Sequence, residues 1–166
     1  MNTLLKSSYG NTQLTAGQIL RDPLMFVAFG FGSGLSRYMP GTMGTLAAIP
    51  VYLLLAETSS PTAYLIGTLV LMVLGVPICQ YAAEKLAVHD FGGIVWDEVV
   101  GLLLTLLGFS FSWQILVAGF VLFRFFDIVK PWPIRFIDKR IHGGLGIMLD
   151  DVLAAVFANL VLHLIF

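Results

Sequence analysis

The sequence predicts an all-α, polytopic membrane protein, a bundle of about five apolar helices with its polar motifs at the cytoplasmic face. Of the 166 residues, 58% are apolar and 11% are charged, whereas soluble domains carry about 25% charged residues. The apolar runs are rich in Leu, Ala, Val and Met, and they lack the alternation of a half-buried strand. We expect residues 1–166 to form one membrane-embedded domain, with residues 1–25 as a flexible or peripheral N-terminal segment.

Five apolar segments are the candidates for the helices of this bundle. They are residues 45–56, 62–83, 99–111, 113–126 and 152–166. Only the second reaches the roughly 20 residues that a helix needs to cross the hydrocarbon, so the others would have to extend into their flanking turns. Pro50 and Pro77 lie inside two of the segments, where we expect them to bend the helices.

The positively charged residues are concentrated on one side of the membrane in this topology. If all five segments cross, the nine Lys and Arg residues lie on or just inside the side that holds the N-terminal region, residues 84–98 and residues 127–151. The positive-inside rule assigns that side to the cytosol and the C-terminus to the outside. The polar motifs described next therefore share one membrane face.

Charge and cysteine content also restrict the function. A net charge of -1 and the absence of a basic run with interleaved aromatic residues exclude nucleic acid as an expected partner. The single cysteine, Cys79, lies in an apolar segment without an electropositive neighbour, so we interpret it as a packing residue.

A motif rich in glycine and hydroxyl groups precedes the first apolar segment. Its backbone N–H groups, its hydroxyls and a following helix N-terminus would suit a phosphate. The alternative is a re-entrant or interfacial loop whose threonines cap a helix. The motif alone does not choose between the two, and its candidate substrate-binding residues are Ser33, Gly34, Ser36, Thr42 and Thr45.

Two pairs of acids stand at the beginning of apolar segments. Asp97 and Glu98 follow a Gly-Gly turn near Asp90, and Asp150 and Asp151 follow a second glycine-rich stretch. An acid at mid-bilayer costs roughly 2.5–3.5 kcal/mol, so these acids either stay at the headgroup level or have partners. Helix capping is the simpler interpretation, but it explains one acid better than two adjacent ones.

A row of alternating charges ends the fourth apolar segment. Arg124, Asp127 and Lys130 follow one another at a spacing of three, which places them on one helix face. An intrahelical ion pair between the first two is the simplest interpretation. The two cations could instead hold a phosphate while the acid binds a metal ion.

Carboxylates that converge from three helix ends without His or Cys partners suit a hard cation, and Mg²⁺ fits best because it binds through a few carboxylates and a substrate phosphate. Sequence motifs of a serine, cysteine or phosphoaspartate nucleophile are absent. If a phosphate ester is cleaved, direct attack by a metal-activated water, without a covalent intermediate, is therefore the favoured route.

These motifs together resemble the phosphatidylglycerophosphatase A family of bacterial membrane-bound, Mg²⁺-dependent lipid phosphatases. The resemblance extends from about residue 29 to residue 151 and includes the final helix. It is carried by the strings GSGLS, PGTMGTLAAIP, HDFGGIVWDEVVG, FRFFDIVKPWPIRFID and HGGLGIMLDD. No acidic or basic motif position departs from the family pattern.

The resemblance implies hydrolysis of phosphatidylglycerophosphate to phosphatidylglycerol and inorganic phosphate, the last step of phosphatidylglycerol synthesis. It also implies a multi-pass protein of the bacterial inner (cytoplasmic) membrane with a cytosolic active site; a homo-oligomer is left open. We expect a catalytic set of acids, Asp97, Glu98, Asp127, Asp150 and Asp151. Metal ligands are expected from four of these and Asp90, namely Asp97, Glu98, Asp150, Asp151 and Asp90. Arg124 and Lys130 are expected to hold the phosphate oxygens.

Two other classes of protein remain as alternatives. A metal-dependent alcohol phosphatidyltransferase also uses acids at helix ends, but the D-G-x-x-A-R signature is absent. A small membrane ion carrier would place ionisable residues at mid-span, whereas here they lie at the ends of the apolar segments.

Overall fold

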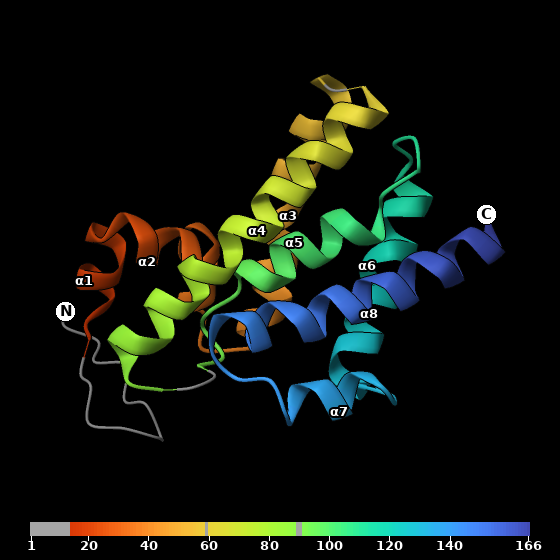
Figure 1. The fold of residues 1–166 in the computed structure, drawn as a ribbon. Helices are drawn as coiled ribbons and strands as arrows, with labels where there is room; N and C mark the ends of the chain where they lie inside the picture. Colours follow the sequence, from red (N-terminus) through yellow and green to blue (C-terminus); the bar gives the residue numbers. More distant parts are fainter. Residues whose placement is uncertain (1–13, 59, 89–90) are drawn as a thin grey trace.

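The computed structural model describes residues 14–58, 60–88 and 91–166, and within these ranges it contains helices and no strands. The predicted all-α class is confirmed. The chain order is α1 (Ala16–Arg21), α2 (Pro23–Ala28), the 3-10 helix η1 (Gly30–Leu35), α3 (Pro40–Thr58), α4 (Pro61–Leu86), α5 (Trp96–Thr105), α6 (Trp113–Val129), α7 (Ile134–Asp138) and α8 (Gly143–Ile165). Figure 1 shows their arrangement.

The helix boundaries follow from local sequence chemistry. The Ser60 hydroxyl accepts a hydrogen bond from the backbone N–H of Ala63, and Pro61 occupies the first position of α4, where its missing N–H costs nothing. At the start of α2, the Asp22 carboxylate caps the N–H groups of Leu24 and Met25. A hydrogen bond from the Lys85 ammonium, with that from the Met25 N–H, lowers the pKa of Asp22 to about 2. Residues 14–25 are therefore folded, and they are tied to the end of α4.

Each predicted apolar segment coincides at least in part with a helix, although segment 99–111 extends beyond the end of α5, and the helices differ in length. Helices α4 and α8, of 26 and 23 residues, are long and apolar enough to cross a membrane. Helix α5 has 10 residues, which corresponds to about 15 Å at the rise of an α-helix, about half of the hydrocarbon thickness. The five complete crossings expected from the sequence are therefore not confirmed. Both Pro50 and Pro77 lie inside continuous helices.

The early end of α5 has a structural cause. The side-chain amide of Asn159 on α8 donates to the carbonyls of Thr105 and Leu107, each at 2.9 Å. These bonds satisfy carbonyls that the end of a helix leaves without intrahelical partners. Gly108 then reverses the chain with a φ of +90°, a conformation that glycine adopts without a steric penalty. Residues 106–112 are thus a turn instead of the end of a crossing.

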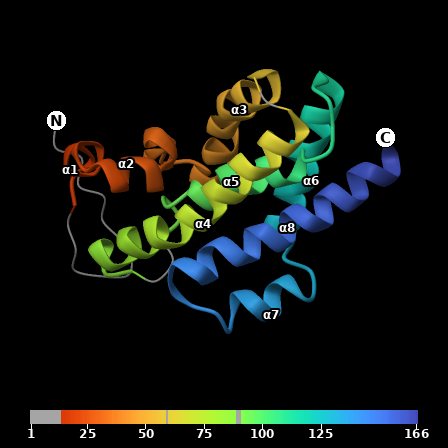
Figure 2. The ribbon, with the colours of Figure 1, turned by 45° about the horizontal axis from the view of Figure 1, so that its top comes forward.

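Helix α8 occupies the centre and contacts α4, α5, α6 and α7. In Figures 1 and 2 the α3–α4 turn, the α5–α6 turn and the C-terminus lie toward one end of the molecule. The N-terminal helices, the α4–α5 connection and α7 lie toward the other. The connections between helices therefore form two separate groups, one at each end of the molecule.

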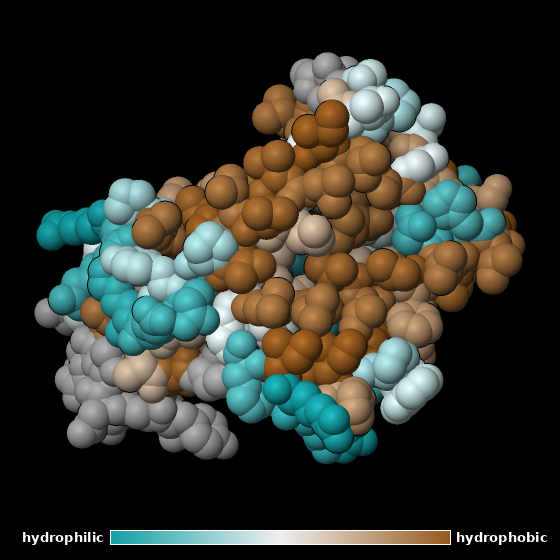
Figure 3. All heavy atoms as spheres, in the orientation of Figure 1, coloured by the Kyte–Doolittle hydropathy of each residue, from teal (hydrophilic) through white to brown (hydrophobic). Residues whose placement is uncertain are grey.

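The surface between these ends is strongly apolar. Figure 3 shows an apolar region over α4, α5 and α8, with hydrophilic residues concentrated at the margins. On α4, large side chains such as Ile66, Val70 and Val73 are exposed. Soluble monomers rarely expose a contiguous apolar patch of more than a few hundred Å². This surface is typical of a protein that faces lipid.

Candidate active site

An acidic cavity of about 290 Å³ opens where four helices meet. Its walls come from the first turn of α5, the end of α6, α7 with the following connection, and the first turns of α8. Six acids and one lysine line it, namely Asp97, Glu98, Asp127, Asp138, Asp150, Asp151 and Lys130. The structure thus brings together most of the charged residues that the sequence singled out.

The start of α5 is anchored by its neighbours. The backbone N–H of Val95 donates to the carbonyl of Ala28 at 2.8 Å, and the Trp96 indole donates to the Leu71 carbonyl at 3.3 Å. Both side chains are buried. These contacts hold the first turn of α5 in place, and this turn carries Asp97 and Glu98. Residues adjacent on a helix point about 100° apart, so Asp97 and Glu98 can serve different partners.

The start of α8 is fixed by a contact with α4. The Gly144 N–H donates to the Gln80 side-chain oxygen at 2.6 Å, and the Gln80 amide donates to Glu84 at 2.6 Å. Gly144 also lies directly against the backbone of α4, where its lack of a Cβ permits the close approach. This crossing places Asp150 and Asp151 at the cavity, and Asp151 is only 3% exposed.

The two acids of α8 have different partners. Asp150 forms an ion pair with Lys130. Asp151 joins Asp97 and Glu98, and one carboxylate oxygen from each of the three lies within 4.8 Å of the others. The two adjacent acids of α8 therefore contact different groups, as the angle of about 100° between neighbouring residues on a helix allows.

These carboxylates fit a divalent cation. One oxygen from each of Asp97, Glu98, Asp150 and Asp151 is buried without a hydrogen-bond partner among the described residues. A buried carboxylate that lacks a partner is costly, because it loses hydration without compensation. The donors are all oxygens, which Mg²⁺ and other hard cations prefer. Asp97, Glu98 and Asp151 are thus the residues that could hold the ion.

Arg124 lies beside the cavity and holds two of its acids. Its Nη1 atom is 2.6 Å from an Asp127 carboxylate oxygen and 3.6 Å from Oε1 of Glu98. All three side chains are largely buried. Gly41, at the start of α3, packs against the same guanidinium. The intrahelical ion pair is therefore present, and a contact of Arg124 with phosphate stays a prediction.

Lys130 lies at the mouth of the acidic cluster. Its ammonium donates to Asp138 at 2.7 Å and to Asp150. Burial would lower the pKa of Lys130, but the hydrogen bonds with these two acids outweigh it and raise the pKa above its usual value. Lys130 also ends α6 in the left-handed region, with a φ of 43°, a strained conformation for a non-glycine residue that is often found at functional sites.

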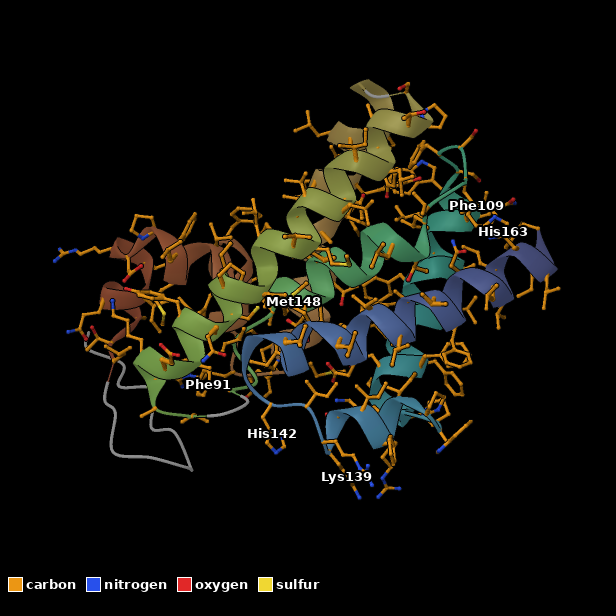
Figure 4. All side chains as sticks on the ribbon, in the orientation of Figure 1. Phe91, Phe109, Lys139, His142, Met148 and His163 are labelled. Atoms are coloured by element: carbon orange, nitrogen blue, oxygen red, sulfur yellow. The ribbon has the colours of Figure 1, made fainter. Side chains whose placement is uncertain are left out.

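Asp138 is the acidic residue of the cavity that the sequence analysis did not single out. It lies eight residues after Lys130 and on a different helix, so no helical spacing links the two. The only signal was its position at the end of the string FRFFDIVKPWPIRFID. His142 also lines the cavity, and Figure 4 shows it at the end of the molecule that carries α7.

The glycine-rich motif lies outside the lining of this cavity. Gly34 packs against the backbone of Gly93, and Gly44 packs against Val95, so the glycines join η1 and α3 to the start of α5. Ser36 donates to the Tyr38 carbonyl, and the buried Thr45 donates to the Gly41 carbonyl. Ser33 and Thr42 are partly buried in the same region. Phosphate binding by these residues stays a prediction, and the expected ligand Asp90 lies outside the described residues.

Comparison with known proteins gives consistent results. Residues 26–166 match the sequence profile of a family described as Phosphatidylglycerophosphatase A. The chain is 45% identical over 148 residues to the Escherichia coli protein of that name, which covers 88% of this chain and 85% of the relative. It is 46% identical over 147 residues to the Haemophilus influenzae protein of the same name, covering 88% of this chain and 90% of the relative.

A third relative has a different name. The chain is 39% identical over 141 residues to a Bacteroides thetaiotaomicron protein that is provisionally named a phosphatidylinositol-3-phosphatase, and the match covers 81% of this chain and 87% of the relative. No solved structure matches the chain. All three relatives carry the names of enzymes that remove phosphate from lipids.

Proposed function

The chain belongs to the phosphatidylglycerophosphatase A family, and we propose that it hydrolyses phosphatidylglycerophosphate to phosphatidylglycerol and inorganic phosphate, the last step of phosphatidylglycerol synthesis. It is an enzyme of the phosphoric monoester hydrolase class. The observation that carries the proposal is the convergence of Asp97, Glu98 and Asp151, with ligand oxygens within 4.8 Å of one another, in a cavity that also contains a lysine.

The proposed cofactor is Mg²⁺, held by Asp97, Glu98 and Asp151, with Asp150 adjacent. When bound, such an ion neutralises the phosphate oxygens and favours deprotonation of an attacking water. The unpartnered oxygens of the buried acids support this assignment. The first acid of α8, Asp150, is paired with Lys130, so this lysine lies next to the acids that would hold the ion.

The residues of the chain have separate tasks in the proposed reaction. Lys130 binds nonbridging oxygens of the terminal phosphate and stabilises the charge that develops on them. A cavity carboxylate not used by the ion, Asp127 or Asp150, takes the proton of the attacking water. The water oxygen bonds to phosphorus, and the bond from phosphorus to the glycerol oxygen breaks. That oxygen leaves as an alcohol after it accepts the proton that the carboxylate took from the water. Arg124 positions Glu98 and Asp127 through its ion pairs.

We place the protein in the bacterial cytoplasmic membrane as a multi-pass protein with its cavity facing the cytosol. The lengths of α4 and α8, the exposed apolar surface and the separation of the helix ends support a membrane location. The concentration of Lys and Arg on the side of α7 supports the orientation. The substrate could then be bound with its acyl chains still in the bilayer.

Substrate identity is tested by phosphate release from purified protein in mixed micelles. We expect release from phosphatidylglycerophosphate with a catalytic efficiency at least about tenfold above that for phosphatidylinositol 3-phosphate, a difference of about 1.4 kcal/mol in transition-state binding. Equal or greater efficiency with the inositol lipid would assign the chain to the activity named for its Bacteroides relative. An alcohol phosphatidyltransferase or an ion carrier would release no inorganic phosphate from either lipid.

A further inference from the structure

A second hollow beside α7 shares the lining residue Lys130 with the acidic cavity. It is a groove of about 450 Å³ formed by the end of α6, the connection to α7 and one face of α7. Its lining combines aromatic side chains, Trp132 and Phe136, with the cations Arg135, Lys139 and Lys130. None of the described residues that line it is acidic. The groove is therefore apolar and positively charged.

The aromatic side chains of the groove are unusually exposed. Trp132 is 82% exposed and Phe136 is 47% exposed, although both are large enough to contribute strongly to a core. Arg135 and Lys139 are also exposed. Tryptophan beside basic residues is typical of the level of lipid headgroups, where the ring is partly apolar and the cations reach phosphates. Figure 4 places Lys139 at the margin of the molecule, near His142.

Lys130 connects the groove to the acidic cavity. It lines both hollows, and its ammonium contacts Asp138 and Asp150 on the cavity side. A molecule that occupied both spaces would therefore pass Lys130. The acids line the first hollow and the aromatic and other cationic residues line the second, so the two hollows offer different chemistry to the two ends of one ligand.

We propose that the α7 groove binds the phosphodiester and the adjoining glycerol backbone of the lipid substrate. This inference rests on the proposed function. Phosphatidylglycerophosphate carries a terminal phosphomonoester, which is cleaved, and a phosphodiester that joins the headgroup to the diacylglycerol. With the monoester in the acidic cavity, the diester lies on the other side of Lys130, where Arg135 and Lys139 neutralise its charge. Trp132 and Phe136 contact the apolar part of the lipid.

This assignment makes Arg135 and Lys139 specificity-determining residues that do not take part in bond cleavage. They favour lipids that carry a phosphodiester as well as a terminal phosphate. Their loss should weaken binding of substrate and of product, since phosphatidylglycerol retains the diester. The rate at saturating substrate should change less than KM, because the contacts are the same in the ground state and the transition state.

The test compares the double variant Arg135→Ala/Lys139→Ala with wild type and with Arg21→Ala. Arg21 is an exposed cation at the end of α1 and lies apart from both hollows. We expect KM for phosphatidylglycerophosphate in mixed micelles to rise about tenfold in the double variant, the factor for loss of one charge-assisted hydrogen bond. The charge-conserving variant Arg135→Lys/Lys139→Arg should restore most of the affinity, and Arg21→Ala should match wild type.

Binding of phosphatidylglycerol provides a second readout that needs no turnover. Native mass spectrometry of the purified protein in a neutral detergent should show binding of phosphatidylglycerol in preference to phosphatidylcholine, and weaker binding by the double variant. Equal binding of phosphatidylglycerol by wild type and the double variant, or a fall in kcat with KM unchanged, would overturn the inference. Loss of phosphatidylglycerol binding in the variant together with no hydrolysis by wild type would refute the proposed function and leave the groove assignment standing.

Discussion

Arg124 is the residue on which the arrangement of the acids depends most directly. It contacts Asp127 and Glu98, and all three side chains are largely buried. Arg124→Ala should lower the free energy of unfolding by about 3 kcal/mol or more, since it leaves two buried acids without their cation. Arg124→Lys should lose less, because it keeps the charge without the planar fork. Thermal unfolding in detergent measures both, and an Arg124→Ala protein as stable as wild type would contradict the assigned positioning role.

For single residues, the sequence analysis predicted which acids form the site better than it predicted which charged residues form ion pairs. Asp97, Glu98 and Asp151 meet, although only the first two lie at a helix start. Asp151 lies inside α8, because that helix begins at Gly143, well before the apolar segment that the sequence marks. The acid pairs follow apolar segments directly, and burial of adjacent acids is too costly to leave without partners. The pairing of Lys130 with Asp138 was not predictable, because it depends on how the chain reverses between α6 and α7. The metal identity stays a prediction.

The crossing of α8 over α4 is the contact between elements that positions the second acid pair. A Cβ on Gly144 would overlap the Val76 carbonyl and lie 2.6 Å from the backbone nitrogen of Gln80. Gly144→Ala should therefore separate the helices at a cost of about 1–3 kcal/mol, and it should lower activity by moving Asp150 and Asp151.

Gly17→Ala is the matched control for this substitution. An added Cβ at Gly17 meets no atom within 4 Å, so this variant should be as stable and active as wild type. Measurement of thermal unfolding and of phosphate release for both variants tests whether the close approach at Gly144 is needed for stability and activity. Equal activity and stability of the two variants would show that the close approach of α8 to α4 is not required.

The elements show why glycine-rich sequence is a weak signal of phosphate binding. Gly34, Gly44 and Gly93 bring η1, α3 and the start of α5 into contact, which spacing alone could not distinguish from an anion-binding loop. The short α5 has a similar explanation. Its apolar run extends to Phe111 in the sequence, but Asn159 and Gly108 end the helix early. The packing of the glycines and the early end of α5 both depend on contacts between residues far apart in the chain.

For the whole molecule, the arrangement of helix ends predicts two faces that are accessible from opposite sides of the membrane. Ser110, in the α5–α6 turn, and Arg140, after α7, are both exposed. Single cysteines at these positions in a Cys79→Ala background should react with a membrane-impermeant maleimide from outside and inside, respectively. Cys79 itself is fully buried, so its removal should cause little change in exposure. Labelling of both positions from the same side would contradict the proposed orientation.

The all-α class and the apolar surface could be predicted because composition and the cost of an unpaired backbone in lipid determine them. The number of complete crossings could not be predicted, since four of the five segments are shorter than the bilayer requires and their boundaries depend on tertiary contacts. The acidic cavity depends on this assembly, because its residues come from α5, α6, α7 and α8 and their connections.

The central claim is that Asp97 and Glu98 on α5 and Asp151 on α8 form one metal-dependent phosphatase centre. Its most direct test is a Mg²⁺ titration of phosphate release from phosphatidylglycerophosphate by folded, quantified wild type, Asp97→Asn and Asp151→Asn. Wild type should lose activity in a chelator, and each variant should need at least about tenfold more Mg²⁺ for half of its maximal rate, because one charged ligand is lost. Full wild-type activity in the chelator, or wild-type rates and Mg²⁺ requirement in both variants, would show that these acids do not hold a catalytic metal ion.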